Sequence, residues 1–353
     1  MSLHTNSKKP WSLWHKRLHK ELKRKNNLLP AGSSLLISVS GGQDSIALLQ
    51  LIIDLQRLYK WKLHVWHGDH GWHENSKTIA GELEQWCKNK QIAFSIASTE
   101  KNKVSTEKDA REWRYTNLIE QAIKLSEENP EVPCKYVLTG HTGTDRAETF
   151  LMNLARGSHI AGLSSLRERR ILQGEIELIR PMLIFDRQET LQICEEMNLP
   201  VWIDPSNSNI QLTRNRIRKE VLPVLEILNV GCTMRIASLA DSLAHLHSDQ
   251  YQLTKLAIQA ISNEQGINRK EMIKLPSTVR AIIFYQWFKD NDVKPPSSKQ
   301  MYELGHKIEK NKPPSSIDLS NGWKVKWDKE LITLIGPSNQ NKKEFNQSQN
   351  VAF

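Results

Sequence analysis

The feature that most constrains this chain is the stretch LLISVSGGQDS, which runs from residue 35 to residue 45. Its first five residues are mostly apolar and predict a short strand, which Gly41 and Gly42 then end. From Asp44 onward apolar residues recur on one side of a helix, at Leu48, Leu49, Ile52 and Leu55. A tight turn between a strand and a helix presents unpaired amide groups and the positive end of the helix dipole. The sequence therefore predicts an anion-binding turn.

The same stretch has the form SGGxDS, in which two serines add hydroxyl donors to the turn. No lysine follows the glycines, so the stretch is not the G-x-x-x-x-G-K-S/T loop of simple NTP hydrolysis. SGGxDS resembles the PP-loop of the ATP pyrophosphatases, enzymes that split ATP into AMP and pyrophosphate to adenylate a substrate. The resemblance implies that ATP is bound by Ser40, Gly41, Gly42, Gln43, Asp44 and Ser45. An ordinary glycine turn is the structural alternative.

Length and charge limit the class of protein. The 353 residues are enough for two domains and a substantial core. A formal charge of +10 favours a polyanionic partner, although eight of the Lys and Arg residues lie within residues 1–27. That segment also carries apolar residues at helical spacing, namely Trp11, Trp14, Leu18 and Leu22. We therefore predict a basic helix at the domain edge, and contact of its charged face with RNA stays open.

Cysteine usage and hydropathy point to a reducing compartment. The four cysteines, Cys87, Cys134, Cys194 and Cys232, form no C-x-x-C pair, which argues against a sequence-contiguous zinc or iron–sulfur site. The longest apolar run, residues 46–55, is too short to cross a bilayer. We expect a cytoplasmic protein with no membrane partner. Its oligomeric state is left open, with a homodimer among the options.

Strand and helix patterns alternate along the first part of the chain. Strands are predicted at residues 35–39, 63–66, 92–96, 135–138 and 176–179. This order predicts a Rossmann-like α/β domain with a parallel sheet, whose ligands lie at the carboxyl ends of the strands. Asp69 and His70 follow the second strand and are expected to face the same crevice as the glycine turn. A metal site that includes His67 and His73, or a hydrogen-bonded loop, are the alternatives.

Two later helices carry pairs of like charges. Arg111 and Arg114 lie three residues apart and suit a phosphate, unless they form a solvated face paired to Glu107 or Glu112.

Asp145 and Glu148 open the helix after the fourth strand, so both fall on one exposed edge. They could complement the helix N-terminus, or hold an amine and accept its proton. A basic cluster after the last strand, Arg214, Arg216 and Arg218, is a candidate for contact with tRNA phosphates, with a solvated basic helix as the alternative.

The pattern changes after residue 228. No strand pattern is visible before residue 290, and apolar residues recur at helical spacing, so residues 229–336 are predicted to form a smaller, mainly helical domain. Asn321 and Gly322 separate two short runs, the second at residues 331–335, which predicts a small hairpin. The tail, residues 337–353, is rich in Asn, Gln, Ser and Lys and is predicted to be disordered.

Together these stretches resemble the tRNA(Ile)-lysidine synthetase family. Five segments agree in order, namely SGGQDS, the loop containing DHG, AREWRY, GHTGTDRAETFLMNLARGS, and WIDPSN with RNRIRKEVLP. The resemblance implies a PP-loop catalytic domain at residues 1–228 and a helical domain at 229–336 that helps to hold tRNA. The implied reaction joins L-lysine to C2 of the wobble cytidine of tRNA(Ile) with a CAU anticodon, through an adenylated cytidine. ATP is consumed, AMP and pyrophosphate are released, and Mg²⁺ is expected with the nucleotide.

The resemblance also implies roles for single residues. Asp44 would act through a divalent metal or orient the nucleotide, and Arg111 and Arg114 would offset charge on the phosphates. Asp145 and Glu148 would hold the lysine ammonium and help to remove its proton.

The chain departs from the family pattern beside this acidic pair. Thr144 and Asp145 stand where the family usually has two acids, and His141 and Thr142 where it has two histidines. The contribution of the first acid is therefore in question, and Arg146, in place of a usual glutamine, adds charge beside the site.

Three rival functions share parts of this pattern. A PP-loop tRNA thiolase would need paired cysteines or a cluster, which the spacing does not offer. A small-molecule PP-loop ligase would leave the arginine-bearing helix unexplained. A non-catalytic RNA-binding relative would not need Asp44, Asp145 and Glu148.

Overall fold

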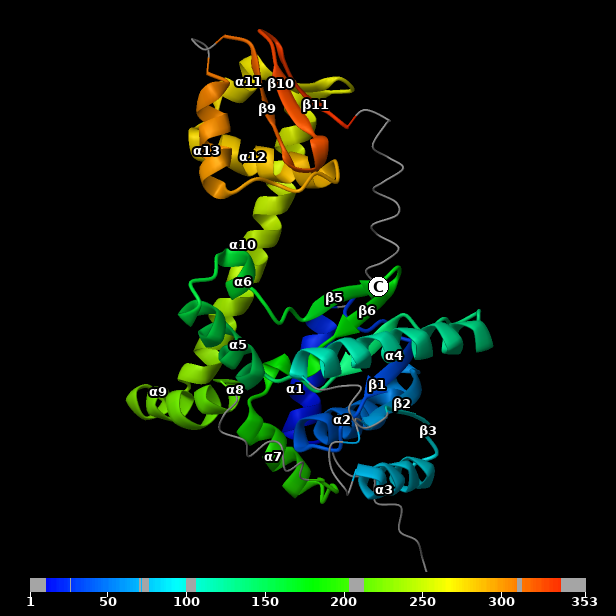
Figure 1. The fold of residues 1–353 in the computed structure, drawn as a ribbon. Helices are drawn as coiled ribbons and strands as arrows, with labels where there is room; N and C mark the ends of the chain where they lie inside the picture. The colour runs from blue at the N-terminus through cyan, green and yellow to red at the C-terminus, as the bar shows by residue number, and fades with distance from the viewer. Residues whose placement is uncertain are drawn as a thin grey trace, which may run out of the picture. The chain divides into compact units, whose positions relative to one another are not determined.

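The computed structural model describes residues 11–25, 27–69, 71, 76–99, 106–202, 213–309 and 313–337. The chain divides into two compact units, Met1–Ala244 and His245–Phe353 (Figure 1). A 30-residue helix, α10, Cys232–Ile261, contributes residues to both units.

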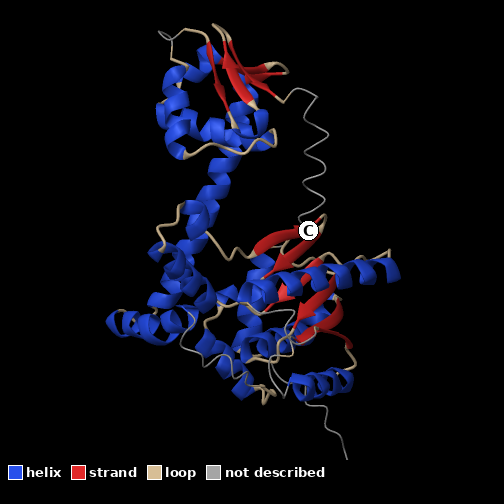
Figure 2. Cartoon of the chain, in the orientation of Figure 1, coloured by secondary structure: helices blue, strands red, loops and turns tan. Residues whose placement is uncertain are grey.

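A six-stranded sheet forms the centre of the first unit (Figure 2). Its strands are β1 Ser34–Ser38, β2 Lys62–Asp69, β3 Ala93–Ser98, β4 Tyr136–Thr139, β5 Arg169–Gln173 and β6 Ile176–Ile179. They lie in the order β3-β2-β1-β4-β6-β5, and every neighbouring pair is parallel except β5 and β6. The parallel α/β prediction is confirmed. The antiparallel edge strand β5 was not predicted, because RRILQ shows neither an apolar run nor alternation.

Helices cover both faces of this sheet (Figure 1). The helices that lie entirely within the first unit, whether or not they contact the sheet, are α1 Leu13–Arg24, α2 Gln43–Tyr59, α3 Ser76–Asn89, α4 Glu107–Glu128, α5 Gly143–Ala155, α6 Ile160–Leu163, α7 Arg187–Glu196, α8 Thr213–Arg216 and α9 Leu222–Leu228. A 3₁₀ turn, Pro181–Ile184, precedes α7, and a π-helical turn, Ile217–Val221, joins α8 to α9.

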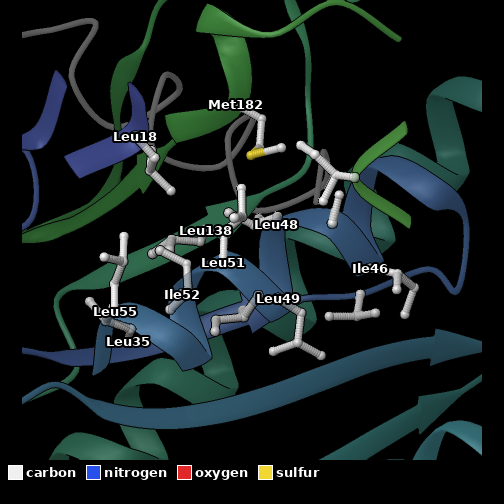
Figure 3. Close-up of a cluster of buried hydrophobic side chains, with 14 of the residues drawn as sticks. Leu18, Leu35, Ile46, Leu48, Leu49, Leu51, Ile52, Leu55, Leu138 and Met182 are labelled. Atoms are coloured by element: carbon white, nitrogen blue, oxygen red, sulfur yellow. The ribbon is translucent and has the colours of Figure 1, made fainter. Parts of the chain in front are cut away.

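Successive side chains of β1 point to opposite faces of the sheet and pack in two different hydrophobic cores. Leu35 and Ile37 pack in the core that contains α2, whereas Leu36 packs in the core that contains Leu118 of α4. Besides Ala47, six large apolar residues of α2 are fully buried, namely Ile46, Leu48, Leu49, Leu51, Ile52 and Leu55, and Figure 3 shows these six among neighbouring core side chains. At about 1.5–3 kcal/mol for each such side chain, this burial anchors the helix that follows the glycine turn.

The basic N-terminal helix packs on this core, as predicted. Ser12 caps α1 with a capping box, and Leu18 and Leu22 are buried. The guanidinium of Arg17 lies 4.7 Å from the ring centroid of Phe185 and pairs with Glu189 of α7. The apolar face of α1 therefore serves packing; contact of its charged face with RNA stays a prediction.

The second unit contains its own sheet and core. Its strands are β7 Ser262–Asn263, β8 Gly266–Asn268, β9 Ser315–Asp318, β10 Lys324–Trp327 and β11 Leu331–Ile335, in the antiparallel order β7-β8-β11-β10-β9. Its other helices are α11 Arg269–Lys274, α12 Ser277–Asp290 and α13 Ser298–Lys307. Phe284, Phe288 and Trp327 are central to its core.

Two details of the predicted second domain are wrong. The expected absence of strands before residue 290 is contradicted by β7 and β8, which are too short to produce a recognisable pattern. The turn at Asn321 and Gly322 joins the antiparallel strands β9 and β10 rather than leading directly into residues 331–335, which form the next antiparallel strand, β11. The tail from residue 338 lies outside the described residues.

Among the described residues, no one helix is long and apolar enough to cross a bilayer. The bent pair Thr213–Leu228 and Cys232–Ile261 meets that test on length and composition alone.

Candidate functional site

The glycine turn lies between β1 and α2 and is fixed by its own serines. The hydroxyl of Ser45 donates to the carbonyl of Gly42 at 2.8 Å and accepts from the amide of Ser40 at 3.2 Å. Gly41 has φ +90°, a conformation that favours glycine. Gly42 is the N-cap of α2 and supplies no side-chain cap, so the amides of Gln43 and Asp44 are not capped by it, whereas the amide of Ser45 donates to the Gly42 carbonyl at 3.1 Å. This geometry suits an anion.

The carboxylate of Asp44, in the first turn of α2, is held by two residues of α7. Its Oδ2 accepts from Nη1 of Arg187 at 2.7 Å, and its Oδ1 accepts from the hydroxyl of Thr190. Gln43 bonds to the same segment, since its Nε2 donates to the carbonyl of Arg187 at 2.7 Å. Burial raises the pKa of Asp44, and nearby Asp145 adds to the rise, although Arg187 opposes it. Sequence reasoning missed Arg187 and Thr190 because both lie more than a hundred residues from the turn.

The carboxyl end of β4 lies directly against the start of α2. A Cβ placed on Gly140 would lie 2.8 Å from the carbonyl carbon and oxygen of Asp44. Because these are backbone atoms, the contact cannot be relieved by a side-chain rotation. Glycine at this position therefore lets the ends of β1 and β4 form one crevice, as expected for the carboxyl edge of a parallel sheet.

Asp145 and Glu148 occupy that edge on α5, and two arginines pair with both. Arg214 donates from Nη2 to Asp145 and from Nε to Glu148, each at 2.7 Å. Arg218 donates from Nη2 to Glu148 at 2.9 Å and to Asp145 at 3.3 Å. The side chain of Glu148 has no solvent exposure. We call these four residues, Asp145, Glu148, Arg214 and Arg218, the acid–arginine cluster.

Asp145 has the first of the two roles that the sequence left open, at the helix N-terminus, and its role in holding an amine stays a prediction. Its Oδ2 accepts from the amide of Thr142 at 2.7 Å, which completes a capping box at the start of α5. Its Oδ1 faces the arginines. Burial alone would raise the pKa of Asp145, but Arg214 and the Thr142 amide bring it below its usual value. Burial lowers the pKa of His141, so a neutral imidazole lies beside this carboxylate.

The predicted tRNA-contacting arginines separate into two environments. Arg214 and Arg218 turn toward the acidic pair, whereas Arg216 is exposed and pairs with Glu220 at 3.1 Å. The π-helical turn after α8 contributes to this arrangement, because the extra residue in a π turn shifts which side chains face α5.

The remaining predicted residues lie around the same edge. Asp69, at the end of β2, is buried and accepts from the amide of Gly71 at 2.8 Å, which fits the hydrogen-bonded loop alternative. His70 lies outside the described residues. Arg111 is exposed with its guanidinium 5.3 Å from the ring centroid of Tyr115, and Arg114 is half-buried.

The positions that depart from the family pattern are used structurally. The hydroxyl of Thr144 accepts from the amide of Arg187 at 3.0 Å, and Thr142 caps α5. Arg146 is buried and pairs with Asp241 of α10 at 2.9 Å. The added charge of Arg146 is therefore neutralised away from the acidic pair.

The cysteines do not form a reactive group. Burial raises the pKa of Cys87 and of Cys134 to about 11 and that of Cys194 to about 12, so these thiols stay protonated at neutral pH. No group of three His, Cys, Asp or Glu residues that could hold a metal ion is found in the part of the chain that the structure describes.

Comparison with known proteins agrees with this geometry. Residues 14–225 match the sequence family described as PP-loop domain. A protein of Prochlorococcus marinus named tRNA(Ile)-lysidine synthase is 60% identical over 335 residues, which cover 95% of this chain and all of that protein. A Pyropia yezoensis protein named tRNA(Ile)-lysidine synthase, chloroplastic, is 39% identical over 72% of this chain and 75% of its own length.

Among solved structures, the U34-tRNA thiolase NcsA from Methanococcus maripaludis superposes with a TM-score of 0.50. The identity is 17%, and the match covers 65% of this chain and 80% of that one. At this identity the likeness shows a shared fold.

Proposed function

We propose that this chain, which belongs to the tRNA(Ile)-lysidine synthase family, joins lysine to C2 of the wobble cytidine of a tRNA(Ile) with a CAU anticodon. The observation that carries the proposal is one crevice in which an uncapped helix start, Asp44 and an acidic pair on α5 come together. ATP and tRNA are the substrates that the family name and the PP-loop domain imply; lysine as the amine donor is part of the proposal.

The first step activates the base. The C2 oxygen of cytidine attacks the α-phosphate of ATP, a C2–O–AMP bond forms, and pyrophosphate leaves. Backbone amides at the start of α2 would stabilise the negative charge of the departing pyrophosphate, and the hydroxyl of Ser45 fixes the turn that presents them. Arg187 and Thr190 fix the carboxylate of Asp44 beside this turn, which supports its role in orienting the nucleotide.

The second step is substitution by the amine. The neutral ε-amine of lysine attacks C2, a C–N bond forms, AMP leaves, and the amine loses its proton to a base. The ionised Asp145 and the buried Glu148 supply negative charge for an incoming ammonium group. Because Arg214 and Arg218 already pair with both acids, lysine must share or displace part of the acid–arginine cluster.

Mg²⁺ does not fit the carboxylates as they are placed. Both oxygens of Asp44 accept from Arg187 and Thr190, and those of Asp145 accept from Thr142 and Arg214. Magnesium requires oxygen ligands in near-octahedral geometry. No step of the proposed reaction is therefore assigned to a metal.

The thiolase alternative has little support in the geometry. The likeness to a U34-tRNA thiolase shows the fold alone, and three of the four cysteines are buried with raised pKa values. One relative is named chloroplastic, so membership of the family does not determine the compartment. The cytoplasmic location of this chain is therefore part of the proposal.

The decisive experiment is nucleoside mass analysis of tRNA(Ile) incubated with the protein, ATP and isotopically labelled lysine. We expect labelled lysidine that depends on all three components. Unmodified cytidine, or a sulfur-containing base in its place, would contradict the proposal.

Two variants separate the steps. Ser45→Ala should reduce tRNA-dependent exchange between ATP and pyrophosphate, because the turn loses the hydrogen bonds that join Ser45 to Ser40 and Gly42. Asp145→Asn should retain more of this exchange yet need more lysine for product. If Asp145→Asn leaves the lysine requirement unchanged, the acidic pair does not hold the amine.

A further inference from the structure

A group of arginines beside the crevice has no role in the function proposed above. Arg180 directly follows β6, at the same carboxyl edge of the sheet as the glycine turn, and its side chain is 2% exposed. Arg170 lies on the antiparallel edge strand β5, in register with Leu178 of β6. Both flank Tyr115 of α4, whose other neighbour is Arg111.

The three guanidiniums converge on one tyrosine. Those of Arg111 and Arg170 lie 5.3 Å and 5.5 Å from the ring centroid of Tyr115. The Tyr115 hydroxyl interacts with Arg180, which also experiences repulsion from Arg111 and Arg170. Attraction to the ring face accounts for the positions of Arg111 and Arg170, and the Tyr115 hydroxyl for that of Arg180, but neither neutralises the three positive charges.

Arg180 is incompletely satisfied. One of its Nη atoms donates to the carbonyl of Arg167, while its Nε is buried without a hydrogen-bond partner among the described residues. Among the residues that the structure describes, no carboxylate forms an ion pair with Arg111, Arg170 or Arg180. A buried guanidinium without a counter-ion is costly, and two adjacent cations add to the cost. An anion bound between them would remove both penalties.

We propose that Arg111, Arg170 and Arg180, gathered around Tyr115, bind a phosphate of the tRNA backbone. Guanidiniums recognise phosphate oxygens with paired hydrogen bonds, and the half-exposed ring between them suits a nucleic-acid surface. The exposed positions of Arg111 and Arg170 make the site accessible from outside the crevice. We choose the tRNA over ATP as the source because the backbone amides at the start of α2 already suit the nucleotide phosphates.

The site adjoins the acidic pair. Arg180 directly follows β6, which pairs in parallel with β4, and Asp145 lies on α5, the helix that follows β4. A tRNA phosphate held here would therefore position the chain of the anticodon loop next to the crevice. This inference rests on the proposed function, because it names the part of tRNA that the same edge of the sheet holds.

The test measures tRNA affinity at several salt concentrations for Arg170→Gln and Arg111→Gln. Each variant should bind tRNA about tenfold more weakly, since one charge-assisted contact is lost. Each should also lower the slope of log K against log salt by about 0.7, the value for one phosphate of a single strand. The matched control is Arg57→Gln, which removes an exposed arginine at the end of α2. A tRNA affinity that falls equally in the control overturns the proposal.

ATP affinity, measured without tRNA, distinguishes the two sources of phosphate. It should be unchanged in Arg170→Gln; Arg111→Gln is not used for this comparison, because the family resemblance implies that Arg111 lies near the nucleotide phosphates. Weaker ATP binding with unchanged tRNA binding would assign the site to the nucleotide and overturn the proposal. Arg170→Lys, which keeps the charge, should recover part of the tRNA affinity, and thermal melting checks that each variant is folded.

Lysidine formation by the unaltered protein separates this proposal from the proposed function. If the protein binds tRNA but forms no lysidine, and Arg170→Gln still weakens binding, the proposed function fails and the phosphate site stands. If lysidine forms while both arginine variants bind tRNA normally, the phosphate site fails alone.

Discussion

Replacing Glu148 by glutamine should destabilise the first unit far more than a comparable change at the surface. Glu148 is fully buried and accepts from Nε of Arg214 at 2.7 Å and from Nη2 of Arg218 at 2.9 Å. Glutamine keeps the shape but removes the charge, and its NH₂ group would face a guanidinium. The acid–arginine cluster then has one negatively charged carboxylate, instead of two, for its two positively charged guanidiniums.

The size of the effect follows from burial. Removing one partner of a buried ion pair costs about 3–5 kcal/mol, because the other charge is left uncompensated. Here the side chains of Arg214 and Arg218 are 25% and 19% exposed, and Asp145 still pairs with both. The lower end, about 3 kcal/mol, is therefore expected. In a domain of this size that corresponds to a fall in melting temperature of roughly 6–12 °C.

The assay is differential scanning calorimetry at pH 7, following the transition of the unit that contains Glu148. The matched control is Glu220→Gln, whose partner Arg216 lies 3.1 Å away with both side chains largely exposed. Exposed pairs of this kind contribute about 0.3–0.5 kcal/mol, so a shift of about 1–2 °C is expected. Equal shifts in the two variants would refute the buried acid–arginine cluster.

Three further outcomes follow from the geometry. Gly140→Ala should weaken ATP binding and cost about 1–3 kcal/mol, because its Cβ would meet the backbone of Asp44; an unchanged ATP affinity would contradict the close approach. The folded pKa of Asp145 is lowered, so its stabilisation is complete above its unfolded pKa of about 3.9 and is lost as pH falls through the lower folded value. The melting temperatures of the unaltered protein and Asp145→Asn should therefore converge below about pH 4; a constant difference would count against an ionised Asp145. Alkylation of the native protein at pH 7.5, read by mass spectrometry, should modify Cys232 first, because the other three thiols are buried; rapid reaction of all four would show that the core opens.

The sequence determined the features that are local. The glycine turn and the first turn of α2 arise from residues a few positions apart, so their order along the chain was sufficient to predict them. The capping box of α5 is equally local but was not predicted. The alternation of strands and helices gave the parallel sheet for the same reason, and the sheet placed Asp44 and Asp145 at one edge. Strands without a pattern, such as β5, β7 and β8, were missed.

Only the tertiary structure decided which charges meet. Arg214 lies 66 residues from Glu148, and Arg187 lies 143 residues from Asp44, so no local sequence pattern predicts either ion pair. The gathering of Arg111, Arg170 and Arg180 likewise depends on strand order and on the packing of α4. Electrostatic partners are set by distance in space, and local periodicity carries no information about distances between segments that are remote along the chain.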